Sequence, residues 1–455
     1  MLRLTVLLLF ACCCAISYPP YQNIISEMDR YVIQCRQEGL SGITARRVAM
    51  GNSTEGREMA AFCFGNCDRG QFAYLLMGGI HGREGLSVVT CLQFVSRLID
   101  LLQKRSKWIL DILSDTMVWV IPSLNPDTHD FNVAASLRFG TSTRYGMQRK
   151  NRKETCPQNA RVARMESGVD LNRNFPVCFD VDEFGSSGRP CSDIYRGPFP
   201  LSESESQSFI RFLHSLRTTP TFAISLHAYG RSILHPFSCK SLAPTLNASS
   251  LFSFQQATKH LLHSISAKYT TGQAWNTPGL YTVNGDVVDY LWAKEGIPAV
   301  NIELPPDYPQ SKDYLGFWPE EGYEAECVQL AMNGLELSRC NVIRTREGIR
   351  NEGFGRCVIE VNEGGNRLTR QLNPFEHLIL SSPTNEVRIG DRKRFYFWNE
   401  TAGVFEEGQP VAEERMMLHY YSVEELSVRD ANRVVVVQIV VIVVFLFLFV
   451  FYTLL

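Results

Sequence analysis

Apolar residues recur along the first third of the chain with two different periods, which distinguishes helices from strands. They repeat at helical spacing over 21–38 and 84–102, so each segment predicts an α-helix. Strand-like runs occupy 43–50, 58–64, 72–78 and 116–124. The last run, TMVWVIPSL, is apolar on both faces, and such a strand belongs in the middle of a sheet that helices cover on each side.

The alternation of helices and strands resumes after a long polar stretch. Residues 130–200, rich in Arg, Gly and Ser, predict a region of loops. Helices are then expected over 202–215, 252–268, 286–295 and 320–337, and strands over 222–226 and 299–302. This order predicts an α/β domain over residues 18–340, with a mixed, largely parallel central sheet and helices on both faces.

The pattern changes beyond residue 340. Short alternating runs such as CVIEVNEGG, HLILSSP and RKRFYFWN follow one another between turns. They predict a small β-rich accessory domain over residues 341–425, arranged like a β-sandwich. The chain is therefore expected to contain a large α/β domain and a small β domain.

The two ends of the chain indicate a secretory route. Residues 1–17 hold one basic residue, an apolar run, and then Ala15 and Ser17 at the spacing of a signal-peptidase site, so they are expected to be a signal peptide. Residues 434–455 carry no charge and are long enough to span a bilayer. They fit either a C-terminal transmembrane helix or the signal for a glycosylphosphatidylinositol (GPI) anchor. Both interpretations place the protein in the secretory pathway, luminal or at the cell surface, and anchored to a membrane.

Cysteine usage agrees with an oxidising compartment. Three of the 14 cysteines lie in the signal peptide, and most of the other eleven are expected to pair. The odd number leaves at least one free thiol, for which Cys91 is the candidate, whereas Cys63 and Cys67 are expected to form a local disulfide. Triplets that accept N-linked glycans begin at Asn52, Asn247 and Asn399.

Composition and charge narrow the class of partner. Hydrophobic residues make up 45% of the chain and charged residues 20%, which fits a folded globular protein. The net charge is −2, and no basic stripe is available to replace the counterions of a polyanion. Nucleic acid is therefore excluded as an expected ligand.

Polar residues gather where the predicted strands of the α/β domain end. His81, Arg83 and Glu84 follow the strand at 72–78, His227 and Tyr229 follow 222–226, and Glu303 follows 299–302. In open α/β sheets this edge is where ligands bind. Two imidazoles and one carboxylate, His81, His227 and Glu84, are a sufficient ligand set for a catalytic zinc with a fourth position open to water. Glu303 is then free to act as the general base.

Six motifs in the same order resemble those of the zinc metallocarboxypeptidases related to carboxypeptidase A. They are HGRE (81–84), QRKNR (148–152), GVDLNRNFP (168–176), SLHAYG (225–230), LYTVNGDVVDY (280–290) and NIEL (301–304). The resemblance spans residues 60–335. It implies a zinc-dependent exopeptidase that hydrolyses the C-terminal peptide bond of peptides and proteins, with one Zn²⁺ per catalytic domain bound by His81, Glu84 and His227.

The resemblance also implies roles for residues around the metal. Asp170 matches the carboxylate that orients a ligand histidine. Arg149 matches the cation that polarises the scissile carbonyl and stabilises the oxyanion. A clamp on the terminal carboxylate of the substrate is implied at Asn172, Arg173 and Tyr281. Further substrate contacts are implied at Arg83 and Tyr229.

Specificity is expected to depend on Val288, which matches the residue at the floor of the pocket for the departing side chain. Valine there implies a hydrophobic or aromatic C-terminal residue, since burying such a side chain is worth on the order of 2 kcal/mol. Asp286 and Ser238 nearby are polar and weaken that preference.

Two alternatives to a carboxypeptidase stay open. One is a related zinc amidohydrolase, against which the clamp formed by Asn172, Arg173 and Tyr281 argues. The other is a catalytically silent peptide-binding or adhesion protein on the same fold, which is disfavoured because every ligand and base position is filled.

Overall fold

A computed structural model gives the structure of the chain. It describes residues 18–40, 42–135, 146–156, 167–307, 315–319, 322–344, 348–363, 366–379, 386–389, 395–399 and 404–408. The described residues form two compact units. The larger unit extends to Val342 and also includes Asn351–Arg356 and Asn373–Glu376, and the smaller unit takes the other described residues beyond Val342.

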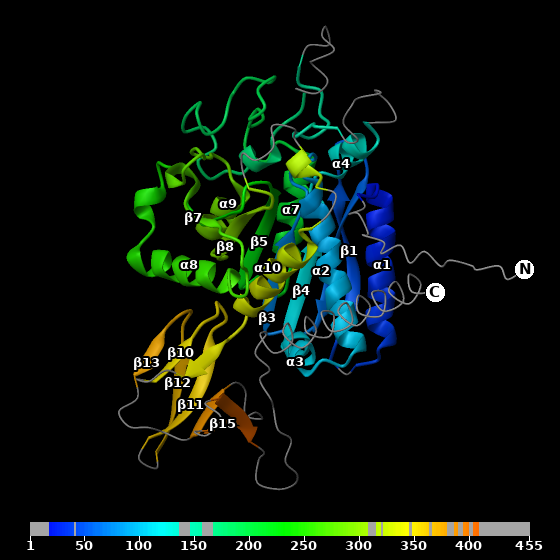
Figure 1. Cartoon of the computed structure of the whole chain (residues 1–455). Helices are drawn as coiled ribbons and strands as arrows, with labels where there is room; N and C mark the ends of the chain where they lie inside the picture. Colours follow the sequence, from blue (N-terminus) through cyan, green and yellow to red (C-terminus); the bar gives the residue numbers. More distant parts are fainter. Residues whose placement is uncertain are drawn as a thin grey trace, which may run out of the picture. The chain divides into compact units, whose positions relative to one another are not determined.

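The larger unit is built on an eight-stranded sheet in the order β1-β2-β4-β3-β5-β8-β6-β7 (Figure 1). Its strands are β1 (Thr44–Asn52), β2 (Glu58–Gly65), β3 (Phe72–Met77), β4 (Thr116–Ile121), β5 (Phe222–Ala228), β6 (Ser232–Leu234), β7 (Thr270–Gly272) and β8 (Ala299–Leu304). The central four, β4, β3, β5 and β8, are parallel, whereas β2 and β6 join them antiparallel. The predicted mixed, largely parallel sheet is confirmed.

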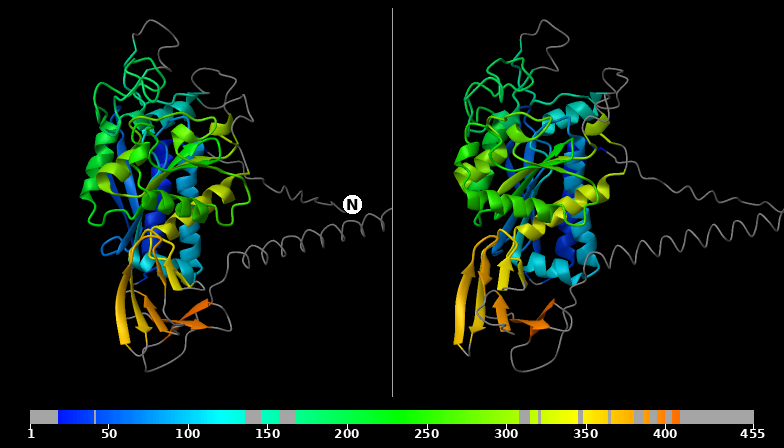
Figure 2. Two further views of the ribbon diagram at one scale, coloured as in Figure 1. Left: turned by 90° about the vertical axis from the view of Figure 1, so that its left-hand side faces the viewer. Right: turned by 60° about the vertical axis from the view of Figure 1, so that its left-hand side comes forward.

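Helices cover both faces of this sheet (Figure 2). One face packs against α1 (Tyr21–Gln37), α2 (Gly85–Gln103), α3 (Lys107–Asp115), α8 (Ala248–Leu261) and α10 (Glu324–Leu337). The other packs against α7 (Ser204–Ser215) and α9 (Val287–Glu295). Strand β3 packs against both groups of helices. Tyr74 and Leu76 face the first group and Leu75 and Met77 face the second, because successive side chains of a strand point to opposite faces.

The start of one helix differs from the sequence prediction, and another helix was not predicted at all. Helix α8 begins at Ala248 rather than 252 because the Asn247 side chain accepts a hydrogen bond from the Ser250 amide at 2.8 Å and caps the helix. Helix α4 (Pro126–Val133) was not predicted. It begins with a proline at its first position, and its apolar residues form no stripe that sequence reasoning recognises.

Beyond Val342 the structure is β-rich, with two sheets. One has the order β13-β10-β9 and the other β12-β11-β14-β15-β16. Their strands are β9 (Val342–Arg344), β10 (Gly348–Asn351), β11 (Cys357–Glu363), β12 (Asn366–Leu372), β13 (His377–Ile379), β14 (Glu386–Ile389), β15 (Phe395–Asn399) and β16 (Val404–Gly408). β10 pairs antiparallel with β13, and all pairs of the five-stranded sheet are antiparallel. The sandwich arrangement stays a prediction.

Disulfides stabilise the larger unit. The predicted Cys63–Cys67 bond is confirmed, and Cys156–Cys191 and Cys178–Cys239 are also formed. Cys340 and Cys357 are disulfide-bonded as well. Cys91 is free and buried as predicted, together with Cys35 and Cys327. This number of disulfides fits an oxidising compartment.

The predicted membrane and signal segments, 434–455 and 1–17, lie outside the described residues. Across the part of the chain that is described, one helix, α2, has the length and apolar composition needed to cross a membrane, and 72% of its most apolar window is buried inside the protein. Its apolar surface is explained by packing in the core.

Candidate active site

Three potential metal ligands meet at the carboxyl edge of the sheet. His81 lies in the turn after β3, Glu84 is the residue before the first turn of α2, and His227 is in β5. His81 Nδ1 is 2.7 Å from Glu84 Oε1, His227 Nδ1 is 3.1 Å from Glu84 Oε2, and the two Nδ1 atoms are 3.3 Å apart. No other group of three such side chains is brought together within the described residues.

The chemistry of these three side chains fits a zinc ion. Each histidine bonds to a second partner through Nε2, His81 to Asp170 at 3.1 Å and His227 to Ser225 at 3.1 Å, which leaves Nδ1 of each to face the common point. Ligands about 2.05 Å from a tetrahedral ion are roughly 3.3 Å from one another, close to the separations seen here. All three side chains are almost fully buried, so a cation would offset the mutual repulsion of their lone pairs.

The two histidines of this group differ in their protonation tendencies: burial opposes a charged His227, but its contact with Glu84 raises its pKa. Burial lowers the pKa of His81, and the charge of Arg149 lowers it further, which favours the neutral imidazole that binds metals. Burial alone would raise the pKa of Glu84, but its contacts with His81 and His227 hold it below its usual value. Glu84 is therefore an anion next to two imidazole nitrogens.

Asp170 connects the candidate metal ligands to two arginines. Its Oδ1 faces His81 Nε2 and also accepts from the Asn172 amide at 3.0 Å, and its Oδ2 accepts from Arg149 Nε at 3.0 Å. Burial would raise the pKa of Asp170, but the positive charges of Arg149 and Arg173 hold it well below its usual range. The carboxylate is fully buried and uses both oxygens.

Arg149 points its guanidinium toward the ligands: Nη1 is 3.5 Å from Glu84 Oε1. Its backbone is fixed to the same turn, because the carbonyl of Arg149 accepts from the Gly82 amide at 3.0 Å. The neighbouring Gln148 is buried and donates to the carbonyls of Asn151 and Ser167, so it supports the loop.

Glu303 lies beside the metal ligands without belonging to them. It is in β8, directly opposite His227 of β5 in the parallel register. Both strands run further than predicted, so His227 and Glu303 are inside strands and not in the turns that follow. Burial raises the pKa of Glu303 to about 7. That value suits a group that accepts and returns a proton near neutral pH.

The structure brings together the three residues of the predicted carboxylate clamp from two segments, and their role stays a prediction. The Arg173 guanidinium is buried and donates from Nη2 to the Tyr281 hydroxyl at 3.1 Å, while Tyr281 is 49% exposed. Asn172 accepts from the Val287 amide at 2.9 Å, which fixes its side chain at the start of α9. Arg173 Nε has no hydrogen-bond partner within the described residues, so a buried donor is available beside an exposed aromatic hydroxyl.

Arg83 and Tyr229 share a neighbour that the sequence did not indicate. The Arg83 guanidinium lies 4.7 Å from the centre of the Phe317 ring, and the Tyr229 ring meets Phe317 edge to face at 5.0 Å. A Cβ on Gly316 would come within 2.6 Å of the Tyr229 ring, so only glycine fits there. No motif marked Phe317, because its position depends on contacts distant in the sequence.

Val288 is fully buried in the first turn of α9, in the hydrophobic core that α7 and α9 form with the sheet. Its predicted place at the floor of a pocket stays a prediction.

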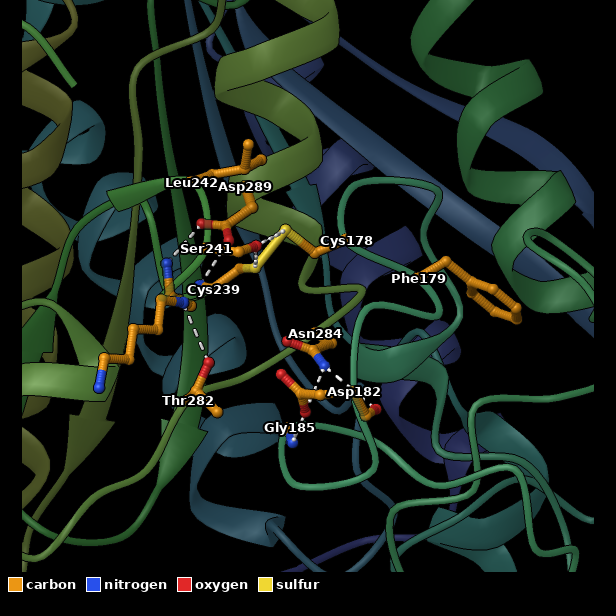
Figure 3. Close-up of a disulfide and its surroundings, with 12 residues drawn as sticks. Cys178, Phe179, Asp182, Gly185, Cys239, Ser241, Leu242, Thr282, Asn284 and Asp289 are labelled. Atoms are coloured by element: carbon orange, nitrogen blue, oxygen red, sulfur yellow. Dashed lines mark hydrogen bonds between the residues drawn. A yellow bond between two sulfur atoms is a disulfide. The ribbon is translucent and has the colours of Figure 1, made fainter. Parts of the chain in front are cut away.

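A disulfide supports the segment that carries Tyr281 (Figure 3). Cys178 and Cys239 join two loops that both bond to this segment. The Lys240 amide donates to Thr282 Oγ1 at 3.0 Å, and the Gly285 amide donates to the Val177 carbonyl at 2.9 Å. The segment that carries Tyr281 is therefore hydrogen-bonded to Val177 and Lys240, the neighbours of the two cysteines of this disulfide.

Together, the sheet and the site define an α/β protein with a candidate mononuclear metal centre at the carboxyl edge of its parallel strands. The family described as zinc carboxypeptidase matches residues 38–331, and the chain belongs to that family. The resemblance inferred from the motifs is thereby confirmed.

Individual relatives agree with the family. The chain is 31% identical to human carboxypeptidase A6 over 284 residues, which is 62% of this chain and 59% of the relative. It is 32% identical to metallocarboxypeptidase A of Trichophyton tonsurans over 282 residues, 60% of each chain. The chain thus matches about three-fifths of the length of these curated relatives.

Solved structures with low identity share the fold. Carboxypeptidase A from Helicoverpa armigera superposes with a TM-score of 0.53 at 20% identity, covering 70% of this chain and 73% of the other. A crystal structure of thrombin-activatable fibrinolysis inhibitor gives 0.54 at 22% identity with the same coverage. These similarities support the α/β fold of the larger unit.

Proposed function

We propose that the protein is a zinc-dependent carboxypeptidase that removes single residues from the C-termini of peptides and proteins, with a preference for hydrophobic or aromatic residues. The observation that carries this proposal is the proximity of two sets of groups. Asp170 contacts both the proposed metal ligand His81 and the cation Arg149, and the clamp begins two residues further along the chain, at Asn172 and Arg173. A terminal carboxylate bound by the clamp would hold the last peptide bond beside the candidate metal site.

Each residue has a chemical task in this proposal. Zinc bound by His81, Glu84 and His227 would polarise the scissile carbonyl and lower the pKa of water toward about 7. Glu303 takes a proton from the attacking water and later returns it to the leaving amine. Arg149 donates to the oxygen that becomes negative, which Asp170 makes effective by fixing the guanidinium.

The clamp accounts for exopeptidase selectivity. Arg173 is a buried cation whose Nε has no partner among the residues that the structure describes, and a bidentate guanidinium is well suited to a carboxylate. Tyr281 is partly exposed at the same place and its hydroxyl already contacts Arg173. A peptide whose C-terminus is an amide lacks the charge that this site requires.

The decisive experiment is Glu303→Gln. The variant keeps the shape of the side chain, so it should fold and bind zinc like the wild type while losing turnover by about 10²-fold or more. Retained turnover would refute the assignment of Glu303. Peptides ending in Phe or Leu should be cleaved as free acids and left intact as amides. Cleavage of the amides would favour the amidohydrolase alternative, and protein that binds no zinc would favour a silent binding protein.

We further propose that the protein is exported through the secretory pathway and anchored to a membrane. The disulfides support an oxidising environment, and Asn52 and Asn247 of the glycosylation triplets are exposed. Release from cells by a phosphoinositide-specific phospholipase indicates a GPI anchor. Retention in the membrane fraction after that treatment indicates a transmembrane helix over 434–455, and recovery in the medium without treatment contradicts both.

A further inference from the structure

Helix α4, which was not predicted from the sequence, contacts the candidate active site through polar side chains. Asn125 precedes the helix, and Thr128 and Asn132 follow at intervals of three and four residues, which places the three side chains on one side of it. All three are completely buried. Buried polar groups on one side of a helix leave no apolar stripe in the sequence, and other segments must satisfy their hydrogen bonds.

Two of these side chains bond to the neighbours of Arg149. Asn132 Nδ2 donates to the Gln148 carbonyl at 2.8 Å, and its Oδ1 accepts from the Gln148 amide at 3.0 Å. Thr128 Oγ1 donates to the Lys150 carbonyl at 2.8 Å. The backbone on each side of Arg149 is therefore held by α4.

The same side of α4 touches the turn that carries two of the candidate metal ligands. A Cβ on Gly82 would lie 2.3 Å from Thr128 Cγ2, so the methyl group of Thr128 packs directly on this glycine. Asn125 Nδ2 donates to the Ile80 carbonyl at 3.3 Å and lies 3.5 Å from the Arg149 carbonyl. Thr128 and Asn125 thus contact the turn and the arginine segment at once.

Other residues of α4 fix the helix to the rest of the larger unit. Asp127 is buried and accepts from Ser53 Oγ and from Arg57 Nη1, both at 2.7 Å. Asp130 accepts from the Tyr21 amide at 2.6 Å and from Arg57 Nε at 3.0 Å. These contacts join α4 to the start of α1 and to the turn between β1 and β2. The helix is therefore anchored independently of the segments that it holds.

The position of Arg149 matters for the chemistry proposed above. A donor that stabilises an oxyanion has to be in place where the charge develops, and a misplacement of about 1 Å can cost on the order of 100-fold in rate. Asp170 fixes the guanidinium of Arg149 at Nε. The backbone that carries this side chain is fixed by α4 and by the Gly82 amide, which donates to the Arg149 carbonyl at 3.0 Å.

We propose that α4 is a positioning element that sets Arg149 relative to the turn of the candidate metal ligands, and that Thr128 is the positioning residue that contacts both. This inference rests on the proposed function, in which Arg149 stabilises the oxyanion. Thr128 acts through the backbone of Lys150 on one side and of Gly82 on the other. A change at Thr128 then alters turnover through the arginine.

The variant Thr128→Val separates the two contacts of this side chain. Valine keeps a methyl group to pack on Gly82 and removes the hydroxyl that donates to the Lys150 carbonyl. For a tripeptide that has a blocked N-terminus and ends in Phe, kcat should fall about tenfold or more with little change in KM, because the arginine acts in the transition state. Zinc affinity, measured by competition with a chelator, should match the wild type. Thr128→Ser restores the hydroxyl and should recover most of the lost kcat. An unchanged kcat in Thr128→Val, or a loss of zinc affinity that parallels the loss of kcat, overturns the proposal.

A double-mutant cycle shows whether Thr128 acts through the arginine. Arg149→Ala alone should lower kcat by about 100- to 1,000-fold, as expected when one oxyanion donor is removed. In that background Thr128→Val should cause no further loss, because no guanidinium is left to misplace. Losses that multiply would mean that α4 supports the fold in general, which refutes the proposal.

A matched control makes the same chemical change in another helix. Thr258 in α8 is 5% exposed, and its Oγ1 donates to the Phe254 carbonyl at 2.9 Å. Thr258→Val should keep the kcat of the wild type. A fall equal to that in Thr128→Val would indicate a general effect of losing a buried hydroxyl and contradict the proposal.

Asn132→Ala serves as the second variant if Thr128→Val does not fold. It removes both hydrogen bonds to Gln148, and it should lower kcat in the wild type but not beside Arg149→Ala. A loss that is the same in both backgrounds overturns the proposal. Wild-type protein that binds zinc and releases no residue from any peptide would instead refute the proposed function itself.

Discussion

Replacing Asp170 with asparagine tests whether the buried carboxylate determines metal affinity. Both oxygens of Asp170 accept hydrogen bonds, Oδ1 facing His81 Nε2 and Oδ2 facing Arg149 Nε. Asparagine supplies one acceptor oxygen and one NH₂ group. Whichever way the amide turns, a donor faces either His81 or Arg149, so one of the two contacts is lost.

The size of the effect follows from which contacts the carboxylate makes. Loss of a carboxylate that orients a ligand histidine weakens metal binding about 10- to 100-fold. This corresponds to about 1.4–2.7 kcal/mol of zinc binding free energy. Turnover at saturating zinc should fall as well, because Arg149 loses the anion that positions it.

The assay titrates metal-free protein with zinc in competition with a chromophoric chelator, and measures kcat/KM separately at saturating zinc. Asp127→Asn is the matched control. Asp127 is also buried and bonded to an arginine, Arg57, and to Ser53, but it contacts none of the proposed ligands. The reasoning is refuted if Asp170→Asn binds zinc as tightly as the wild type, or if both variants lose affinity equally.

Two further predictions concern stability and substrate binding. Replacing Cys178 and Cys239 with serine should raise KM several-fold while zinc content is retained. It should also lower the free energy of unfolding by about 4 kcal/mol, because the disulfide closes a loop with a sequence separation of 61. Steady-state kinetics measure KM, and urea unfolding measures the free energy of unfolding. An unchanged KM would contradict the idea that this disulfide supports the proposed clamp. Asn247→Ala should cost about 1 kcal/mol in urea unfolding through loss of the α8 cap. Ser249→Ala removes the same glycosylation triplet but keeps the cap, so an equal loss in both variants would assign the effect to the glycan.

The central sheet was predictable because its strands are buried on both faces. β3 and β4 are apolar at consecutive positions, which the sequence displays directly. The strand order was not predictable, since it depends on which crossovers join the strands. The short strands β6 and β7, with three residues each, were missed because three residues are too few to establish a period of two.

Several residues of the candidate active site were predictable for a related reason. His81, His227 and Glu303 come at the ends of strands that lie side by side, so the sheet itself brings them together. Phe317 was missed because its segment shows no periodicity and is positioned by tertiary contacts alone. Gly316 fits against Tyr229, and a Cβ on Gly85 would lie within 2.0 Å of the Trp318 ring. Contacts of this kind leave no pattern in the local sequence.

The segment from Tyr281 to Asp286 joins the proposed clamp to the start of α9. Gly285 has a positive φ of 75°, and a Cβ there would lie 2.2 Å from the carbonyl oxygen of Arg173. Only glycine allows this approach, so the segment packs directly on the backbone that carries the clamp arginine. The next residue, Asp286, caps α9 and bonds to Asn301 in the sheet. Because Gly285 and Asp286 are consecutive, the backbone of Arg173 and the start of α9 are held in a fixed relation, and the proposed clamp is positioned together with the helix.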